Sequence, residues 1–253
     1  MNIKKDSIRF RERTYRQQID HSDLCSFIVS VEETDLLILA DCDLSAAAYD
    51  SVYRNRQYLT DIIKQNGTFL SSLAPLDFSK AFESMAPEVV RSMIRASRQA
   101  GVGPMAAVAG AVAECVGRDL LAHSDNVIVE NGGDIFMKFA AADPLTVSIF
   151  AGDSPLSNKV HIKIRPEQTP LGICTSSGTV GHSKSYGHAD AVCVIATKAA
   201  LADAAATAIG NAIKDKSSIK RSLRDGAKIE GVRGIVIIVD DCLGAWGEVE
   251  FKK

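Results

Sequence analysis

Residues 191–214 read AVCVIATKAALADAAATAIGNAIK and predict a strand that leads directly into a helix. The first six residues are apolar and rich in valine and isoleucine, which is typical of a buried strand. The segment from Ala199 onward is rich in alanine and continues at helical spacing. We therefore expect a strand and a helix to meet here, and the residues on that helix then indicate what kind of site it carries.

One face of this predicted helix carries two oxygen-bearing side chains, those of Asp203 and Thr207. Residues four positions apart lie on the same face of a helix, so the carboxylate and the hydroxyl point the same way. Mg²⁺ binds oxygen ligands and usually completes its shell with water and substrate phosphates, so this pair and a nearby carbonyl would suffice for a magnesium site. The alternative is that Asp203 only occupies the first turn, where the helix dipole favours a negative charge. The spacing alone favours this alternative.

A loop rich in hydroxyl groups precedes the strand. Residues 174–190 read CTSSGTVGHSKSYGHAD, and so many hydroxyls and glycines indicate more than a connection. The segment has neither the G-x-x-x-x-G-K-[ST] pattern of a phosphate loop nor the G-x-S-x-G pattern of a hydrolase nucleophile. A lone loop histidine such as His182 is more often exposed or a structural hydrogen bonder than a ligand, so the loop does not by itself specify a reaction.

A second glycine-rich segment, ENGGDI at residues 130–135, separates two strand-like runs. Asn-Gly between strands predicts a hairpin with a type I′ turn, which needs no further function. Two successive glycines also allow a ligand to approach the backbone amides, with Asp134 available to a sugar hydroxyl or a metal. Both interpretations stay open at this point.

The rest of the chain predicts an α+β fold, because runs of strands alternate with paired helices rather than with single ones. The strand-like runs between residues 127 and 164 predict an antiparallel meander. The helix over residues 105–121 is apolar nearly all round, so we expect it to be buried on most sides. The other expected elements are a hairpin at 26–31 and 36–40 and closing strands at 234–239 and 247–251. Two further helices are expected, one capped by Asp43 or Ser45 that runs to about Gln65, and one with Pro87 in its first turn and Gly101 at its end.

Composition excludes several classes of protein. The 253 residues are 46% hydrophobic and 24% charged with a formal net charge of −2, which allows a full core and does not predict a nucleic-acid surface. The 6 cysteines lack a C-x-x-C spacing, so reduced thiols are expected. Residues 1–9 show no signal peptide, and the apolar stretches 102–116 and 199–213 are too short to span a bilayer. We therefore expect a cytoplasmic protein with no membrane partner.

In this order, the three segments resemble those of the ApbE-like proteins, whose members include FAD-dependent flavin transferases that attach FMN to a protein threonine. Residues 202–208 are similar to the A-D-A-x-x-T-A helix of that family. Residues 130–134 resemble its N-x-G-G-D turn and residues 176–178 its T-S-G segment. Residues 108–114 resemble its K-G-Y-A-V-D helix, so the resemblance extends over residues 101–210.

The resemblance implies a fold, a cofactor and a set of site residues. The fold would be a T-fold-like antiparallel sheet with helices packed on one face, as a single domain over residues 1–253 that forms a homo-oligomer. Asp203 and Thr207, with a main-chain carbonyl, would hold the Mg²⁺ that binds the pyrophosphate of FAD. The residues implied to line the nucleotide pocket are Asn131, Gly132, Gly133, Asp134, Ser176, Ser177, Gly178 and Thr179.

The chain also departs from the family pattern. Ala109 stands where the family has lysine, and Glu114 stands where it has aspartate. The H-I-x-D-P-x-T-G segment, whose histidine is expected to take part in flavin transfer, is missing, and His182 or His188 would have to replace that histidine. The compact pattern resembles a branch of the superfamily in which some members are thought to serve sulfur assimilation, in homocysteine formation.

Three functions follow from these observations. The first is an FAD-dependent flavin transferase with His182 as catalytic acid or base and a protein acceptor. The second is an accessory factor or enzyme of sulfur metabolism that keeps the pocket without transferase chemistry, with Cys174 as the better candidate thiol and Cys193 in the core. The third is a structural subunit, which would leave the polar loop and the Asp203/Thr207 pair unexplained.

Overall fold

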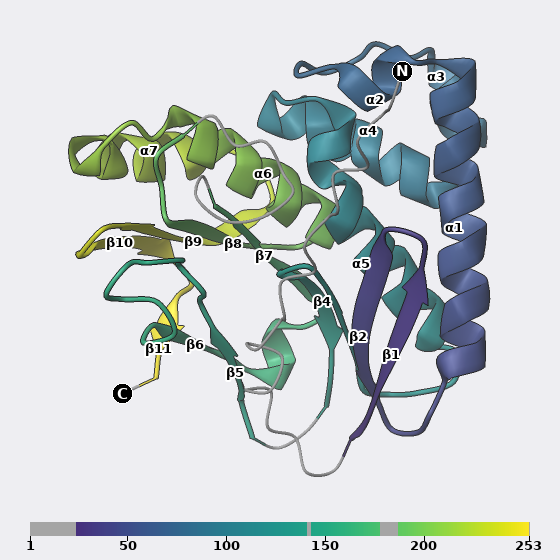
Figure 1. Ribbon diagram of the computed structural model, residues 1–253, viewed down its shortest axis with the longest axis horizontal. Coiled ribbons are helices and arrows are strands. Elements are labelled where there is room, and N and C mark those ends of the chain that lie inside the picture. The colour runs from purple at the N-terminus through teal and green to yellow at the C-terminus, as the bar shows by residue number, and fades with distance from the viewer. Residues whose placement is uncertain (1–23, 141–142, 178–186, 253) are drawn as a thin grey trace, which may run out of the picture.

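The computed structural model describes residues 24–140, 143–177 and 187–252 of the chain. Its centre is a sheet of eight strands in the order β1-β2-β3-β4-β7-β8-β9-β10 (Figure 1). Every neighbouring pair in this sheet is antiparallel. The strands are β1 Cys25–Val31, β2 Thr34–Ala40, β3 Val127–Asn131, β4 Asp134–Lys138, β7 Leu171–Ser176, β8 Ala191–Ala196, β9 Val232–Val239 and β10 Cys242–Gly247.

The helices cover one face of this sheet, and a second, smaller sheet covers the other (Figure 1). The smaller sheet has the order β11-β6-β5, formed by Glu250–Phe251, His161–Ile164 and Leu145–Ser148. The helical segments are α1 Ser45–Gln65, α2 Thr68–Ser71, α3 Lys80–Met85, α4 Glu88–Ala100, η2 Pro104–Ala107, α5 Val108–Leu120, η3 Pro166–Gln168, α6 Ala199–Ala212, η4 Lys216–Ser218 and α7 Ile219–Gly226. The layers are therefore helices, large sheet and small sheet.

Apolar residues alternate between the two faces of the large sheet, as the two-residue period of a strand requires. On β9, Ile235 and Ile237 belong to the core beneath the helices, whereas Val236 and Ile238 belong to the core beneath the small sheet. Both faces are apolar, so the sheet needs a cover on each side. This explains why its central strands are nearly continuous runs of valine and isoleucine.

The prediction of an α+β fold with antiparallel strands is confirmed, and the expected meander is corrected. β4 pairs with β7, and β5 and β6 pair with each other in the small sheet. The chain leaves the large sheet after β4 because the second apolar face, which includes Ile128, Met137 and Ile173, has to be covered. Ile162 and Ile164 of β6 are fully buried in that second core.

Two helix boundaries follow from local chemistry. α4 begins directly after Pro87 and ends at Gly101, whose φ of 73° is the left-handed conformation that glycine adopts readily. The helix expected from residue 105 starts as the 3₁₀ turn η2 and becomes α-helical at Val108. No single helix of the described residues is long and apolar enough to cross a bilayer, although α4 and the bent continuation Pro104–Leu120 together meet the length and composition criteria, at an angle of 106°.

The N-terminus of α6 lies in close contact with both β7 and α5. A Cβ atom on Gly172 of β7 would lie 2.2 Å from the Cα of Ala199, and one on Gly110 of α5 would lie 2.3 Å from the Ala199 carbonyl oxygen. Real side chains do not tolerate such distances from backbone atoms, so glycine is required at both positions. The small side chains of α6 therefore permit a crossing in which its backbone approaches two neighbours.

Gly110→Ala is expected to lower the free energy of unfolding by about 2 to 3 kcal/mol, because the methyl group would overlap the Ala199 carbonyl unless the helices separate. Helix propensity alone would change stability by about 1 kcal/mol in the opposite direction. Urea unfolding followed by circular dichroism measures the sign. Gly67→Ala is the control, because no atom lies within 4 Å of its added Cβ and φ is −60°. A Gly110→Ala protein as stable as the parent would contradict the close crossing.

Candidate functional site

The predicted site residues meet at one end of the large sheet, where β3 turns into β4 and β7 ends. Asp134 is the register partner of Cys174, so the turn at residues 131–134 lies beside the end of β7. The Asn131 side-chain amide donates a hydrogen bond of 3.1 Å to the Ala109 carbonyl oxygen at the start of α5. The structure therefore brings the turn, the end of β7 and the N-terminus of α5 to one place.

The predicted hairpin is present, but the two central residues of its turn are Gly132 and Gly133 rather than Asn131 and Gly132, because Asn131 is the last residue of β3. Gly132 and Gly133 have φ values of 67° and 101°, as a type I′ turn requires at its two central positions. The Gly133 amide donates to the Glu130 carboxylate at 2.7 Å, and Glu130 is buried. A Cβ on Gly133 would meet only Thr175 O at 3.9 Å, so the positive φ rather than a lack of space requires glycine.

Asp203 is the fifth residue of α6 and accepts a hydrogen bond from α5. Its Oδ2 is 2.9 Å from the Gly110 amide nitrogen, and Gly110 is the third residue of α5. α5 has no acidic residue in its own first turn and no side-chain cap from Ala107. The interpretation that Asp203 occupies the first turn of its own helix is wrong, because α6 has no acidic residue there. Asp203 instead compensates the N-terminus of α5.

Two carboxyl groups face this end of the sheet and disfavour each other's charge. Burial raises the pKa of Asp134 well above its ordinary range, and the negative charges of Asp203 and Glu130 raise it further. Burial raises the pKa of Asp203 to about 7, against the lowering effect of the Gly110 and Ala109 amides. Neither carboxyl group forms an ion pair with a lysine or arginine of the described residues. The site is therefore short of positive charge in that part of the chain.

The other predicted ligands are placed as follows. Thr207 is buried on α6, one turn after Asp203. The Oγ atom of Ser176 is buried and has no hydrogen-bond partner among the described residues, and half-buried Ser177 follows it. Gly178, Thr179 and His182 lie outside the described residues. Within residues 24–140, 143–177 and 187–252, no group of three or more His, Cys, Asp or Glu side chains is arranged to hold a metal.

Cys174 is not the accessible loop thiol that the sequence indicated. It lies within β7, is fully buried, and its thiol donates to the Ala199 carbonyl oxygen at 3.3 Å. Burial raises the pKa of Cys174 well above its ordinary value, and the charges of Asp134 and Asp203 act in the same direction. The nucleophilic form of cysteine is the thiolate, so this environment makes Cys174 unreactive. Cys193 lies in β8 and is buried, as predicted, and burial raises its pKa to about 11.

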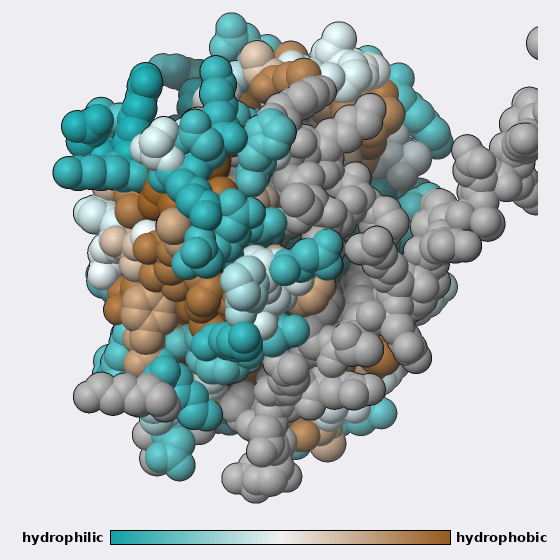
Figure 2. Space-filling view, turned by 60° about the vertical axis from the view of Figure 1, so that its left-hand side comes forward, coloured by the Kyte–Doolittle hydropathy of each residue, from teal (hydrophilic) through white to brown (hydrophobic). Residues whose placement is uncertain are grey.

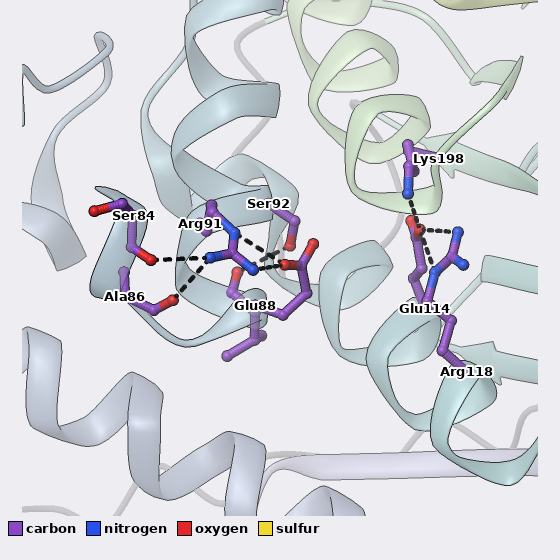
Figure 3. A network of polar contacts seen from close by, with 9 residues as sticks. Ser84, Ala86, Glu88, Arg91, Ser92, Glu114, Arg118 and Lys198 are labelled. Atoms are coloured by element: carbon purple, nitrogen blue, oxygen red, sulfur yellow. Dashed lines mark hydrogen bonds and ion pairs between the residues drawn. The ribbon is translucent and has the colours of Figure 1, made fainter. Parts of the chain in front are cut away.

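Glu114, at the position of a family aspartate, is a buried polar residue whose role the sequence pattern did not predict. Glu114 is 5% exposed and its Oε2 accepts from the Ala199 amide at 2.8 Å. Figure 3 shows its carboxylate between Lys198 and Arg118, which approach Oε1 to 3.2 and 2.8 Å. The sequence does contain a signal for this residue. An acid on a nearly apolar helix that is expected to be buried must have polar partners.

Two shallow depressions lie away from this site, at the other end of α5. One of about 410 Å³ is bordered by α1, α4 and α5, and one of about 450 Å³ by α1 and the end of α5. They share Arg54, Arg118 and Asp119 in their walls. None of the predicted site residues lines either depression, so the sheet end is identified by its chemistry rather than by one of these hollows.

Comparison with known sequences identifies relatives over most of the chain. The model of the family described as AbpE bacteria matches residues 16–230. A UPF0280 protein of Methanocaldococcus jannaschii is 39% identical over 227 residues, which are 87% of this chain and 90% of the relative. A UPF0280 protein of Methanocella arvoryzae is 39% identical over 221 residues, covering 87% of each chain.

Solved structures share the fold at low sequence identity. A mutant of the flavin transferase ApbE from Vibrio cholerae aligns with a TM-score of 0.57 and 13% identity, covering 89% of this chain and 97% of that one. The ApbE protein of Thermotoga maritima aligns with a TM-score of 0.56 and 11% identity, covering 91% and 97%. At this identity the similarity establishes the arrangement of the elements and not the chemistry.

As pH rises, the free energy of unfolding of the Asp203→Asn protein is expected to increase relative to that of the parent. A raised pKa means that, between its ordinary value of 3.8 and about 7, the folded parent holds a proton that the unfolded chain has released. The parent's free energy of unfolding therefore falls through this window, and asparagine removes that loss. The difference should grow by roughly 2 kcal/mol between pH 4 and 8, allowing for partial exposure.

Urea unfolding in EDTA across this pH range measures the difference between the two proteins. Asp61→Asn, which alters an exposed carboxylate on α1, is the matched control. A difference for Asp203→Asn that does not change between pH 4 and 8 would show that this carboxyl group titrates normally.

Proposed function

Because the chain belongs to the family described as AbpE bacteria, and so to the ApbE-like superfamily, we propose that it binds a flavin nucleotide, FAD, through Mg²⁺. Asp203 and Thr207 would hold the ion. The observation that carries the proposal is the pair of carboxyl groups, Asp134 and Asp203, that share one end of the sheet without a positive partner among the described residues. A bound cation would offset their mutual repulsion.

The donor set fits magnesium better than a transition metal. The groups on offer are a carboxylate and a hydroxyl one helical turn apart, and hard oxygen ligands of this kind suit Mg²⁺. The absence of a three-residue cage in the described part of the chain agrees with an ion that takes its remaining ligands from water and phosphate. When bound, Mg²⁺ would neutralise the pyrophosphate and polarise the bond to be broken.

The nucleotide would lie against the β3–β4 turn and the end of β7. Gly132 and Gly133 present backbone without side chains, which allows a phosphate or a ring to approach. The unpartnered Ser176 hydroxyl is available to a ligand, because a buried polar atom without a hydrogen bond is costly. Asn131, Asp134, Ser177, Gly178 and Thr179 would complete the pocket.

The reaction that we propose is transfer of FMN from FAD to a threonine of an acceptor protein. The threonine hydroxyl would lose its proton and bond to the phosphorus of the FMN half, while the pyrophosphate bond breaks and AMP leaves, with His182 as the acid or base that moves the proton. A second candidate, nucleotide binding without transfer, is favoured by Ala109, which stands at the position of the family lysine beside the Asn131 contact. We do not propose a role in sulfur metabolism that uses the Cys174 thiol, because that thiol is fully buried.

The remaining proposals concern the whole molecule: a T-fold, a single domain over residues 1–253, and a homo-oligomer in the cytoplasm. The antiparallel sheet with helices on one face supports the first. For the oligomer, Figure 2 shows apolar side chains gathered on the side of the molecule that carries β10. Leu243 and Trp246 of this outermost strand are 41% and 39% exposed.

Binding of FAD by the purified protein should require Mg²⁺, and Asp203→Ala should weaken it about 100-fold, or roughly 2.7 kcal/mol. Thr207→Ala should weaken it about tenfold, because a neutral ligand contributes less than a charged one. Quenching of flavin fluorescence gives the affinity, and Asp61→Ala, on the surface of α1, is the control. An affinity that neither Mg²⁺ nor Asp203→Ala changes would rule out the metal-held nucleotide.

Transferase chemistry is tested separately by incubating the protein with FAD, Mg²⁺ and a threonine-containing acceptor. Transfer predicts an acceptor that gains the mass of an FMN group, and loss of that gain in His182→Ala. A protein that binds FAD with Mg²⁺ and yields no modified acceptor would favour the second candidate, binding without transfer.

A further inference from the structure

Helices α5 and α6 each supply the N-terminal cap that the other lacks. The Gly110 amide in the first turn of α5 donates to Asp203 of α6 at 2.9 Å, and the Ala199 amide in the first turn of α6 donates to Glu114 of α5 at 2.8 Å. Neither helix has an acidic residue in its own first turn or a capping side chain of its own. The two carboxylates therefore perform the same function reciprocally.

The geometry links the two bonds. Each helix contributes a donor and, four residues later, an acceptor, Gly110 with Glu114 and Ala199 with Asp203, so the bonds lie one turn apart along the crossing. Gly110 brings the two backbones into contact at the same point, since even a Cβ atom there would overlap Ala199. A rotation or slip of α6 that breaks the Glu114 bond would therefore also move Asp203 relative to Gly110.

Glu114 is held more firmly than a simple cap. Oε2 binds the Ala199 amide, and Oε1 binds Arg118 and the Lys198 ammonium. Lys198 is the residue that precedes α6, so Glu114 contacts both the backbone and a side chain at the start of this helix. Its side chain is 7% exposed, whereas those of Lys198 and Arg118 are 52% and 39% exposed.

We propose that Glu114 is a positioning residue for the magnesium site: by binding the first turn of α6, it sets the orientation of Asp203. The part of this proposal that concerns magnesium rests on the function proposed above. Glu114 itself touches neither the ion nor the nucleotide. It fixes the rotation of α6, and with it the place of the Asp203 carboxylate beside Gly110 and near Asp134.

The first experiment uses the protein without ligand. Hydrogen exchange of the amides in residues 107–111 reports the bond between Gly110 and Asp203, and in Glu114→Ala it should be at least about tenfold faster than in the parent. Glu114→Gln keeps an oxygen that can accept from Ala199, so it should recover most of the protection. Unchanged exchange of residues 107–111 in Glu114→Ala would overturn the proposal.

The second experiment measures the Mg²⁺ concentration at which FAD binding is half-maximal. Glu114→Ala should raise this concentration at least about tenfold, and Glu114→Gln by less, if Glu114 acts through Asp203. Val116→Ala is the matched control, because it removes buried side-chain atoms from the same helix and lowers the unfolding midpoint without touching either bond. A rise in Glu114→Ala no larger than that in Val116→Ala would also overturn the proposal.

The two experiments separate this proposal from the proposed function. If the parent protein binds no FAD in the presence of Mg²⁺, the proposed function fails, and hydrogen exchange still decides whether Glu114 orients Asp203. If Glu114→Ala fails to fold, Lys198→Met and Glu114→Met take its place, because Glu114→Met keeps a side chain of similar size and removes the oxygen that accepts from Ala199. Lys198→Met removes one partner of Glu114 from an exposed position, and it should raise exchange of residues 107–111 by a smaller factor. Unchanged exchange in both of these variants would overturn the proposal.

Discussion

The close crossing of α5 and α6 is the contact on which the candidate site depends. At this crossing the Gly110 backbone contacts Ala199, and two buried or half-buried carboxylates bind the opposing helix termini. A capping bond contributes about 1 kcal/mol, and taking a carboxylate out of water costs several. The two carboxylate–amide hydrogen bonds between α5 and α6 therefore contribute little net stability. Their main consequence is that they permit only one relative position of the two helices. Asp203 and the start of α5 are placed together by that constraint.

The two-sided sheet explains why the site lies at a sheet end. Helices cover one face and β5, β6 and β11 cover the other, so residues in the middle of the strands are enclosed by apolar side chains. Polar groups can gather where the strands stop, at the β3–β4 turn and after Ser176. Asp134 and Cys174 mark the boundary: they are neighbours in register, and both lie where the apolar interior begins.

The electrostatics of this sheet end support the proposal of a bound cation. Burial and the charges of Asp203 and Glu130 make the ionisation of Asp134 less favourable than in water, and burial does the same for Asp203. The described residues supply no ion pair to either carboxyl group. At the other end of the crossing, Glu114 has Lys198 and Arg118. Glu114 is thus neutralised by two basic side chains, whereas the pair at the sheet end has no such partner within residues 24–140, 143–177 and 187–252. This difference separates a structural carboxylate from one that is suited to hold a cation.

Local patterns in the sequence were sufficient for the elements and for much of the site composition. The apolar run at residues 234–239, the Asn-Gly hairpin signal and the helical spacing from Ala199 depend on neighbours in the chain. The structure has a strand, a turn centred on Gly132 and Gly133, and a helix at these places. Order along the chain was also sufficient for the family resemblance. These features are readable because their causes, backbone conformation and side-chain period, act over a few residues.

Tertiary packing decided the features that depend on distant residues. Sequence spacing placed Cys174 in a polar loop, but pairing with β4 and β8 buries it within the sheet. The small sheet covers the second apolar face of the large sheet. No local pattern in the sequences of β5 or β6 predicts that they pack there. The partners of Asp203 and Glu114 lie 93 and 85 positions away in the chain, so only the folded arrangement reveals which helix each carboxylate caps. Burial and long-range hydrogen bonds are properties of the assembled structure, and they decide what each of these side chains does.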